Sequence, residues 1–304
     1  MEQKSMTALV SAFSRAYHVE NNKVKIFDDS IARLLLTDEE YFQISKSMAD
    51  GISFFNPNFT GTKDEALRWI VDNQLSPPPL GRAAFAEEAL QTAVSIGTRQ
   101  YLIFGAGYDT FAYRQPTWAE KIQIFEIDHP FTANDKRIRL EKAKITIPNN
   151  VDFIETDFTN EQWQTGLTQN TIFDGNQISF CSILGVAYYL SRQTFNELIT
   201  VLSLILPKGS SIVFDYPDEN TYTEKAGERA KKQALLAGAA NEKMLASYSY
   251  GDMEKILSEH GFLIYEHLTP MEMTQQHFKT YNQANPTHPM TAFDNVNYCL
   301  AVRK

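Results

Sequence analysis

Two apolar runs, the first ending in glycines and the second in acids, constrain this chain more than any other feature. The first run, 101–104 (Tyr-Leu-Ile-Phe), is followed directly by 105–107 (Gly-Ala-Gly), and the second, 122–125, is followed by the acids Glu126 and Asp128. Glycine allows positive φ and a close approach of backbone to a ligand. Strand, glycine turn, crossover, strand and acid is the order of a nucleoside-binding α/β unit, in which the acid accepts hydrogen bonds from a ribose.

The glycine turn alone has a second interpretation, a purely structural turn after a strand. The third glycine of the dinucleotide fingerprint is missing, because Thr110 stands in its place. Asp128, which follows Gly107 by 21 residues at the end of the next apolar run, favours the nucleoside site.

Composition limits the class of protein and of partner. With 304 residues, 43% of them hydrophobic, the chain can bury the core of one large α/β domain. Its net charge of −9 argues against a nucleic-acid surface. Cys181 and Cys299 lie in apolar runs and are expected to be buried free thiols, and no metal-ligand spacing is present. A polar start and the lack of any apolar run near ~18 residues predict a cytoplasmic protein outside the membrane.

The first hundred residues have helical rather than strand periodicity. Apolar side chains recur at helical spacing, and 56–58 and 76–79 (Ser-Pro-Pro-Pro) are expected to be loops. We therefore expect 1–100 to form a helical cap that belongs to the same domain as the rest of the chain.

From residue 101 onward, strand and helix patterns alternate. The expected strands are 101–104, 122–127, 151–155, 178–183, 211–216, 262–268 and 295–302. No strong helix is expected between the last two strands, so they should pair antiparallel, whereas 221–246 is expected to be a charged helical insertion over the ligand edge. The predicted fold is one doubly wound, mostly parallel seven-stranded α/β sheet with an antiparallel last strand, making 101–304 a Rossmann-like core.

Several of these motifs together resemble one known family. Residues 104–110 (Phe-Gly-Ala-Gly-Tyr-Asp-Thr), Arg114, 126–130 (Glu-Ile-Asp-His-Pro) and Lys136 are similar to the leucine carboxyl methyltransferase-like group of class I S-adenosylmethionine-dependent methyltransferases. This group includes polyketide carboxyl O-methyltransferases. The resemblance also covers 15–18, 26–29 and 189–190, and so nearly the whole chain. It implies S-adenosyl-L-methionine as cofactor and S-adenosyl-L-homocysteine as product.

The resemblance also implies a set of cofactor contacts: Gly105, Ala106 and Gly107 under the methionine and ribose, Asp128 on the ribose hydroxyls, Asp157 and Phe158 at the adenine, and Arg82 on the carboxylate. A glutamate common in the family after the fourth strand is replaced here by Leu184 or a close neighbour, so Ser182 or backbone carbonyls would meet the amino group. Simpler roles stay open: Arg82 as a surface arginine, and Asp128 and Asp157 as helix caps.

Candidate substrate residues are fewer and rest on weaker signals. The resemblance leaves Arg15 to assist Arg82 or to bind substrate. His18 is a candidate base if the acceptor is a hydroxyl. Tyr188 and Tyr216 follow the fourth and fifth strands, where ligands approach open α/β sheets, although ordinary packing explains them equally well.

The expected activity is O-methylation of a small-molecule carboxylate. A carboxylate is ionised at pH 7 and needs no general base, which agrees with the lack of an evident catalytic dyad, and no catalytic residue is assigned. Two other classes stay open: an NAD-dependent oxidoreductase that uses the same glycine turn, and a catalytically silent protein that binds S-adenosyl-L-methionine. The sequence does not indicate an oligomeric state.

Overall fold

The computed structural model describes residues 5–158, 160, 162–239, 244 and 246–304. Its described residues contain one seven-stranded sheet with the strand order β3-β2-β1-β4-β5-β7-β6. The strands are β1 Gln100–Phe104, β2 Gln123–Asp128, β3 Val151–Glu155, β4 Ser179–Ile183, β5 Ser211–Pro217, β6 Phe262–Leu268 and β7 Val296–Arg303. Strands β1 to β5 are parallel, and β7 lies between β5 and β6, antiparallel to both. The predicted mostly parallel sheet with an antiparallel last strand is confirmed.

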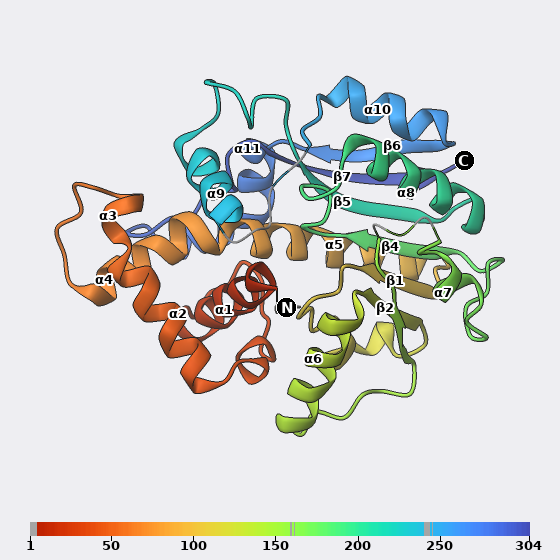
Figure 1. Ribbon diagram of the computed structural model, residues 1–304, viewed down its shortest axis with the longest axis horizontal. Coiled ribbons are helices and arrows are strands. Elements are labelled where there is room, and N and C mark those ends of the chain that lie inside the picture. Colours follow the sequence, from red (N-terminus) through yellow and green to blue (C-terminus); the bar gives the residue numbers. More distant parts are fainter. Residues whose placement is uncertain (1–4, 159, 161, 240–243, 245) are drawn as a thin grey trace.

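Helices surround this sheet (Figure 1). The α-helices are α1 Met6–Asn21, α2 Asp38–Asp50, α3 Ile52–Phe55, α4 Lys63–Ile70, α5 Pro77–Ser95, α6 Pro130–Lys142, α7 Thr165–Thr168, α8 Arg192–Ile205, α9 Glu228–Ala239, α10 Tyr250–Glu259, α11 Pro270–Met273 and α12 Lys279–Ala284. Short 3₁₀ segments are η1 Ala32–Leu35, η3 Phe111–Tyr113 and η4 Thr117–Ala119, and single π-turns are η2 Val71–Leu75 and η5 Thr274–Phe278.

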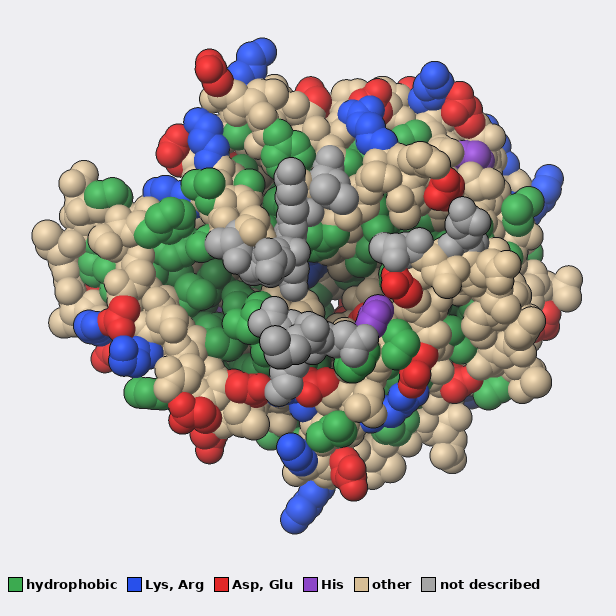
Figure 2. Space-filling view, viewed as in Figure 1, with side chains coloured by type: hydrophobic (Ala, Val, Ile, Leu, Met, Phe, Trp, Pro, Cys, Tyr) green, Lys and Arg blue, Asp and Glu red, His purple; other side chains and the backbone are tan. Residues whose placement is uncertain are grey.

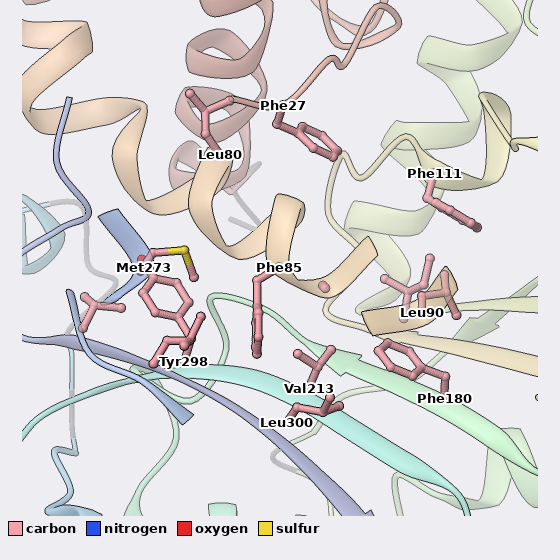
Figure 3. Packing of buried hydrophobic residues seen from close by; sticks show 14 of the residues in the cluster. Phe27, Leu80, Phe85, Leu90, Phe111, Phe180, Val213, Met273, Tyr298 and Leu300 are labelled. Atoms are coloured by element: carbon pink, nitrogen blue, oxygen red, sulfur yellow. The ribbon is translucent and has the colours of Figure 1, made fainter. Parts of the chain in front are cut away.

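Alternating side chains of the strands supply two cores. On one face, Phe85 of α5 lies beside Val213 and Leu90 of α5 beside Phe180, as Figure 3 shows. On the other face, side chains such as Phe214 pack against α8 and α10. Because both faces are covered, β1, β4 and β5 are apolar and buried along their length, as expected for central parallel strands.

Three sequence predictions about helices and loops need correction. Residues 76–79 are not a loop, because 77–79 begin α5, where a proline ring fits and its missing N–H costs no helical hydrogen bond. A continuous helical stretch, made of α11, η5 and α12, separates β6 from β7, and the π-turn η5 interrupts its 3.6-residue periodicity. The helix expected across 221–246 spans only Glu228–Ala239, and 240–243 and 245 lie outside the described residues.

The segments that precede β1 are predominantly helical. Figure 1 shows α1, α2 and α4 gathered beside the sheet, on the left of the view. Helix α4 runs through η2 into α5, and the Ser76 N–H donates to the Val71 carbonyl at 2.9 Å across this turn. Within the described residues, no helix combines the length and apolar character that crossing a membrane requires.

Candidate functional site

A cavity of about 780 Å³ opens at the carboxyl ends of the central strands. The segments that follow β1, β2 and β4 line it on one side, and α1, α5 and α9 line it on the others. In Figure 2, hydrophobic side chains gather around the hollow on this face. The strand order reverses between β1 and β4, which is where open α/β sheets bind their ligands.

The glycine turn forms the floor of this cavity. Gly105 and Gly107 have φ of +64° and +49°, so both adopt the left-handed conformation that side chains disfavour. A Cβ on Gly105 would lie 2.6 Å from Cγ2 of Val186. With Ala106 between them, these glycines leave backbone exposed to the cavity, as close approach of a ligand requires.

The two acids of β2 have different environments. Asp128 lines the cavity, where its Oδ2 accepts from the Gly107 N–H at 2.5 Å and its Oδ1 from the His129 N–H at 2.6 Å. Burial raises the pKa of Asp128, and these two N–H groups oppose the rise. Glu126 is 1% exposed, does not line the cavity, and lies 2.7 Å from Lys136 Nζ. Asp128 is therefore the acid that a ligand in this cavity can reach.

Arg82 reaches the cavity from α5 beside a glycine that the sequence analysis did not single out. Its Nη1 lies 3.5 Å from Oδ2 of Asp215, a completely buried acid at the end of β5. Among the described residues the guanidinium donates no hydrogen bond, so its donors are available to a ligand. Gly185 has φ of +68°, and a Cβ there would lie 2.7 Å from Arg82 Cζ.

Arg15, by contrast, donates a hydrogen bond to the protein from each of its three guanidinium nitrogens. It donates from Nε to Asp29 at 2.7 Å, from Nη2 to the Tyr108 carbonyl at 2.7 Å and from Nη1 to Ser11 at 2.8 Å. Although Arg15 lines the cavity, these bonds make it part of the wall rather than a free anion site.

Asp29 joins the helical segment to the glycine turn. Thr110, at the missing third glycine, donates from Oγ1 to Asp29 at 2.6 Å and accepts from Arg114 Nε at 2.9 Å. Burial alone would raise the pKa of Asp29, but Arg15, Arg114 and the Thr110 hydroxyl outweigh it and hold that pKa below its usual value. A glycine at 110 would lose this connection.

Three further expected contacts also line the cavity. Ser182 is buried at the end of β4, with its Oγ 3.0 Å from Tyr101 Oη. Asp157 and Phe158 follow β3, and the Phe158 ring packs 5.9 Å from that of Phe104. The structure thus brings together all eight residues expected to bind the cofactor: Arg82, Gly105, Ala106, Gly107, Asp128, Asp157, Phe158 and Ser182.

The structure places three of the four candidate substrate residues outside the cavity wall. His18 is completely buried and accepts from the Ile26 N–H at 3.0 Å, and burial lowers its pKa to about 3. Tyr188 donates to Asp215 at 2.9 Å, and Tyr216 Oη lies 2.8 Å from His267 Nε2. These three side chains bond within the protein and do not line the cavity, and their contact with substrate stays a prediction.

The sequence analysis missed Asp215 and Gly185, and both left a signal. Asp215 is a single acid inside the apolar run 211–216, and an isolated charge in a buried strand usually has a partner. Gly185 follows β4 as Gly105 follows β1, at the neighbouring strand end. Among the described residues, no group of three His, Cys, Asp or Glu side chains is placed to hold a metal ion.

Comparisons with known proteins agree with this geometry. The model of the leucine carboxyl methyltransferase family matches residues 8–203. The chain is 38% identical over 309 residues to YktD of Bacillus subtilis (strain 168), which is named as an S-adenosyl-L-methionine-dependent methyltransferase, and the match covers 99% of each chain.

Solved structures show the same fold at low sequence identity. A DUF574 family protein of Streptomyces avermitilis MA-4680 superposes with a TM-score of 0.60 and 12% identity, covering 97% of both chains. A Thermobifida fusca YX protein, described as a methyltransferase, gives a TM-score of 0.57 and 12% identity, covering 99% of this chain and 96% of its own.

Proposed function

This chain belongs to the leucine carboxyl methyltransferase family and is an S-adenosyl-L-methionine-dependent methyltransferase, and from that premise we propose that it methylates a carboxylate of a small molecule. One observation carries the choice of acceptor. The described lining residues that α2, α3, η2 and α9 contribute include no charged side chain and no histidine. A hydroxyl acceptor needs a base, whereas a carboxylate is already ionised at pH 7.

The cavity fits the cofactor by three features of its own. The backbone at 105–107 is open to close approach, Asp128 presents a carboxylate at the end of β2, and Arg82 has donors with no hydrogen-bond partner among the described residues. In our proposal Asp128 accepts from the ribose hydroxyls, and Arg82 binds the cofactor carboxylate. Asp157 and Phe158 contact the adenine, and Ser182 or neighbouring carbonyls meet the amino group.

When bound, S-adenosyl-L-methionine supplies a methyl group that its sulfonium already makes electrophilic. The protein's task is to align the acceptor oxygen at roughly 3–3.5 Å and to keep water out. Helix α1, whose Met6, Ala8 and Val10 line the cavity, supplies part of this enclosure. We therefore infer that 1–100 act as a cap within the same domain as 101–304, with α9 as a further cover from the insertion near 221–246.

The other two functional classes lack support. A nicotinamide oxidoreductase expects a glycine at 110, whereas Thr110 bonds to Asp29 and Arg114. A catalytically silent protein that binds S-adenosyl-L-methionine would differ from an enzyme only in lacking methyl-transfer turnover, which an activity assay measures. The net charge of −9 also supports a small-molecule acceptor over a nucleic acid, and the cytoplasmic location stays a prediction.

Thermal shift and a labelling assay test the proposal in sequence. S-adenosyl-L-methionine and S-adenosyl-L-homocysteine should each raise the Tm, and NAD(H) should not. With methyl-labelled cofactor and a small-molecule extract, the label should enter products from which mild base releases it, as for an ester. Stable label in an ether or amine would exclude the carboxylate acceptor.

A further inference from the structure

The cavity has an acceptor end that differs in composition from the strand ends. We define the acceptor end as the lining residues of α2, α3, η2, the first turn of α5, α9 and Met244. Its apolar side chains include Met48, Phe55, Leu75, Pro78, Leu236 and Met244. The cavity of about 780 Å³ therefore has an apolar region in addition to the strand ends that we assign to the cofactor.

Gln74 is the polar exception that is buried in this end. It lies in η2, lines the cavity and is 8% exposed. Its amide forms no hydrogen bond with another described residue, and it is not among the fully buried unpartnered polar atoms, because it borders the cavity. Gln233 of α9, the other glutamine in the lining, is only half-buried and can reach water. The Gln74 amide is therefore a donor and acceptor that opens onto the cavity, where a ligand can reach it.

The π-turn explains why Gln74 faces the cavity. Its neighbours bond elsewhere: Asp72 accepts from Arg68 Nε at 2.5 Å, and Asn73 Nδ2 donates to the Trp69 carbonyl at 2.9 Å. The wider turn changes the direction of successive side chains, and such turns are frequent at functional sites.

Two hydrogen bonds join α9 to the other segments of the acceptor end, η2 and α3. Arg229 Nη1 donates to the Asn73 carbonyl of η2 at 3.3 Å, and Lys232 Nζ donates to the Phe55 carbonyl of α3 at 2.7 Å. These bonds fix an apolar cover, Leu236 and Ala237, over the space that Gln74 faces.

We propose that Gln74 binds the carboxylate of the methyl acceptor and that the rest of the acceptor is an apolar body within this end of the cavity. The inference rests on the proposed carboxyl methylation and adds the residue and the substrate class. An amide has two N–H donors and no charge, so it can orient a carboxylate while leaving the negative charge available for attack. Arg15 is less suited to this role, because three of its five N–H donors are bonded to Asp29, Ser11 and Tyr108.

Calorimetric binding to the full chain, saturated with S-adenosyl-L-homocysteine, tests both parts. Across hexanoate, octanoate and decanoate, affinity should rise by up to about fourfold per methylene. Gln74→Met, nearly equal in shape, should weaken decanoate about 10- to 100-fold and the uncharged 1-decanol by less than about fivefold. Gln74→Glu should weaken decanoate at least as much near neutral pH, because two carboxylates would then face each other.

Gln275→Met, at an exposed position of η5 that does not line the cavity, is the control, and decanoate should bind to it within about threefold of wild type. Unchanged S-adenosyl-L-homocysteine affinity and Tm would show that each variant is folded. Equal decanoate affinity in wild type and Gln74→Met, or affinity independent of chain length, would overturn the inference. Equal rates of methyl decanoate formation in wild type and Gln74→Met would also overturn the role of Gln74, while the proposed carboxyl methylation would stand. Decanoate that binds but forms no methyl ester would instead count against carboxyl methylation itself.

Discussion

The two ends of the cavity are built in different ways. At the strand ends, backbone and charged side chains are fixed by the sheet, as Asp128 is by the N–H groups of Gly107 and His129. At the acceptor end, apolar side chains come from helices outside the sheet, and the buried polar group there, Gln74, has no bonded partner in the described structure. We infer that the strand ends of the sheet position the cofactor. The helices outside the sheet would then determine which acceptor binds.

The two arginines of the cavity make the same contrast within one wall. Arg15 donates three hydrogen bonds to the protein, whereas Arg82 has only Asp215, at 3.5 Å, as an ionic partner among the described residues. Both are arginines near a glycine turn, yet Arg15 gives three of its five N–H donors to the protein, whereas Arg82 donates no hydrogen bond to a described residue. Residue type alone does not separate a structural cation from a binding one.

The largest effect on cofactor affinity should come from Asp128, the acid at the strand ends. Asp128→Ala removes the carboxylate that we assign to the ribose, so S-adenosyl-L-methionine affinity should fall about 100-fold, because hydrogen bonds to a charged group contribute about 1.5–3 kcal/mol. The free energy of unfolding should fall by about 1–3 kcal/mol, because the substitution also removes the acceptor of the Gly107 and His129 N–H groups. Calorimetry for binding and urea unfolding for stability measure the two quantities.

Glu126→Ala is the contrasting variant, because it leaves Lys136 buried without its acid. It should cost about 3–5 kcal/mol of stability, the usual result of breaking a buried ion pair. The protein that remains folded should bind the cofactor with nearly normal affinity. If Glu126→Ala weakened binding and Asp128→Ala did not, the assignment of the ribose acid would be wrong.

The sequence predicted the strand ends well and the acceptor end poorly, for a physical reason. Gly105, Gly107 and Asp128 are placed by a strand-turn-helix pattern that a sequence displays directly. Gln74 depends on a π-turn, whose wider spacing no 3.6-residue periodicity indicates, and on a helix that begins at three prolines resembling a loop. His18 lies on an apolar helix face, which has the same sequence pattern as a cavity wall. The structure places this side chain in the core.

A pH effect of intermediate size should come from Asp72, which shares η2 with Gln74. Asp72 is 2% exposed, and burial raises its pKa to about 6, opposed by Arg68, with His288 Nδ1 3.9 Å away. An acid whose pKa is raised on folding contributes stability that is full below its unfolded pKa and is lost as pH rises. Stability should therefore fall, on the order of 2 kcal/mol, between about pH 4 and 6.

Urea unfolding across that pH range, compared with Asp72→Asn, isolates this group because the amide oxygen can still accept from Arg68. The variant should lack the fall in stability. Parallel pH profiles of the two proteins would show that Asp72 does not titrate there and that the turn presenting Gln74 is not sensitive to its charge.

The smallest effect on cofactor affinity should come from Gly185. It tests whether the position of the Arg82 side chain depends on the lack of a Cβ at this residue. In Gly185→Ala, the new Cβ would meet the Arg82 guanidinium at a residue with φ of +68°, so Arg82 must move away from Asp215. We expect S-adenosyl-L-methionine to bind about tenfold more weakly, near 1.4 kcal/mol. Gly238→Ala, where no atom lies within 4 Å of the new Cβ, is the control and should bind as wild type does. If Gly185→Ala also bound the cofactor normally, Arg82 would be a structural cation like Arg15, and the contrast between the two arginines would fail.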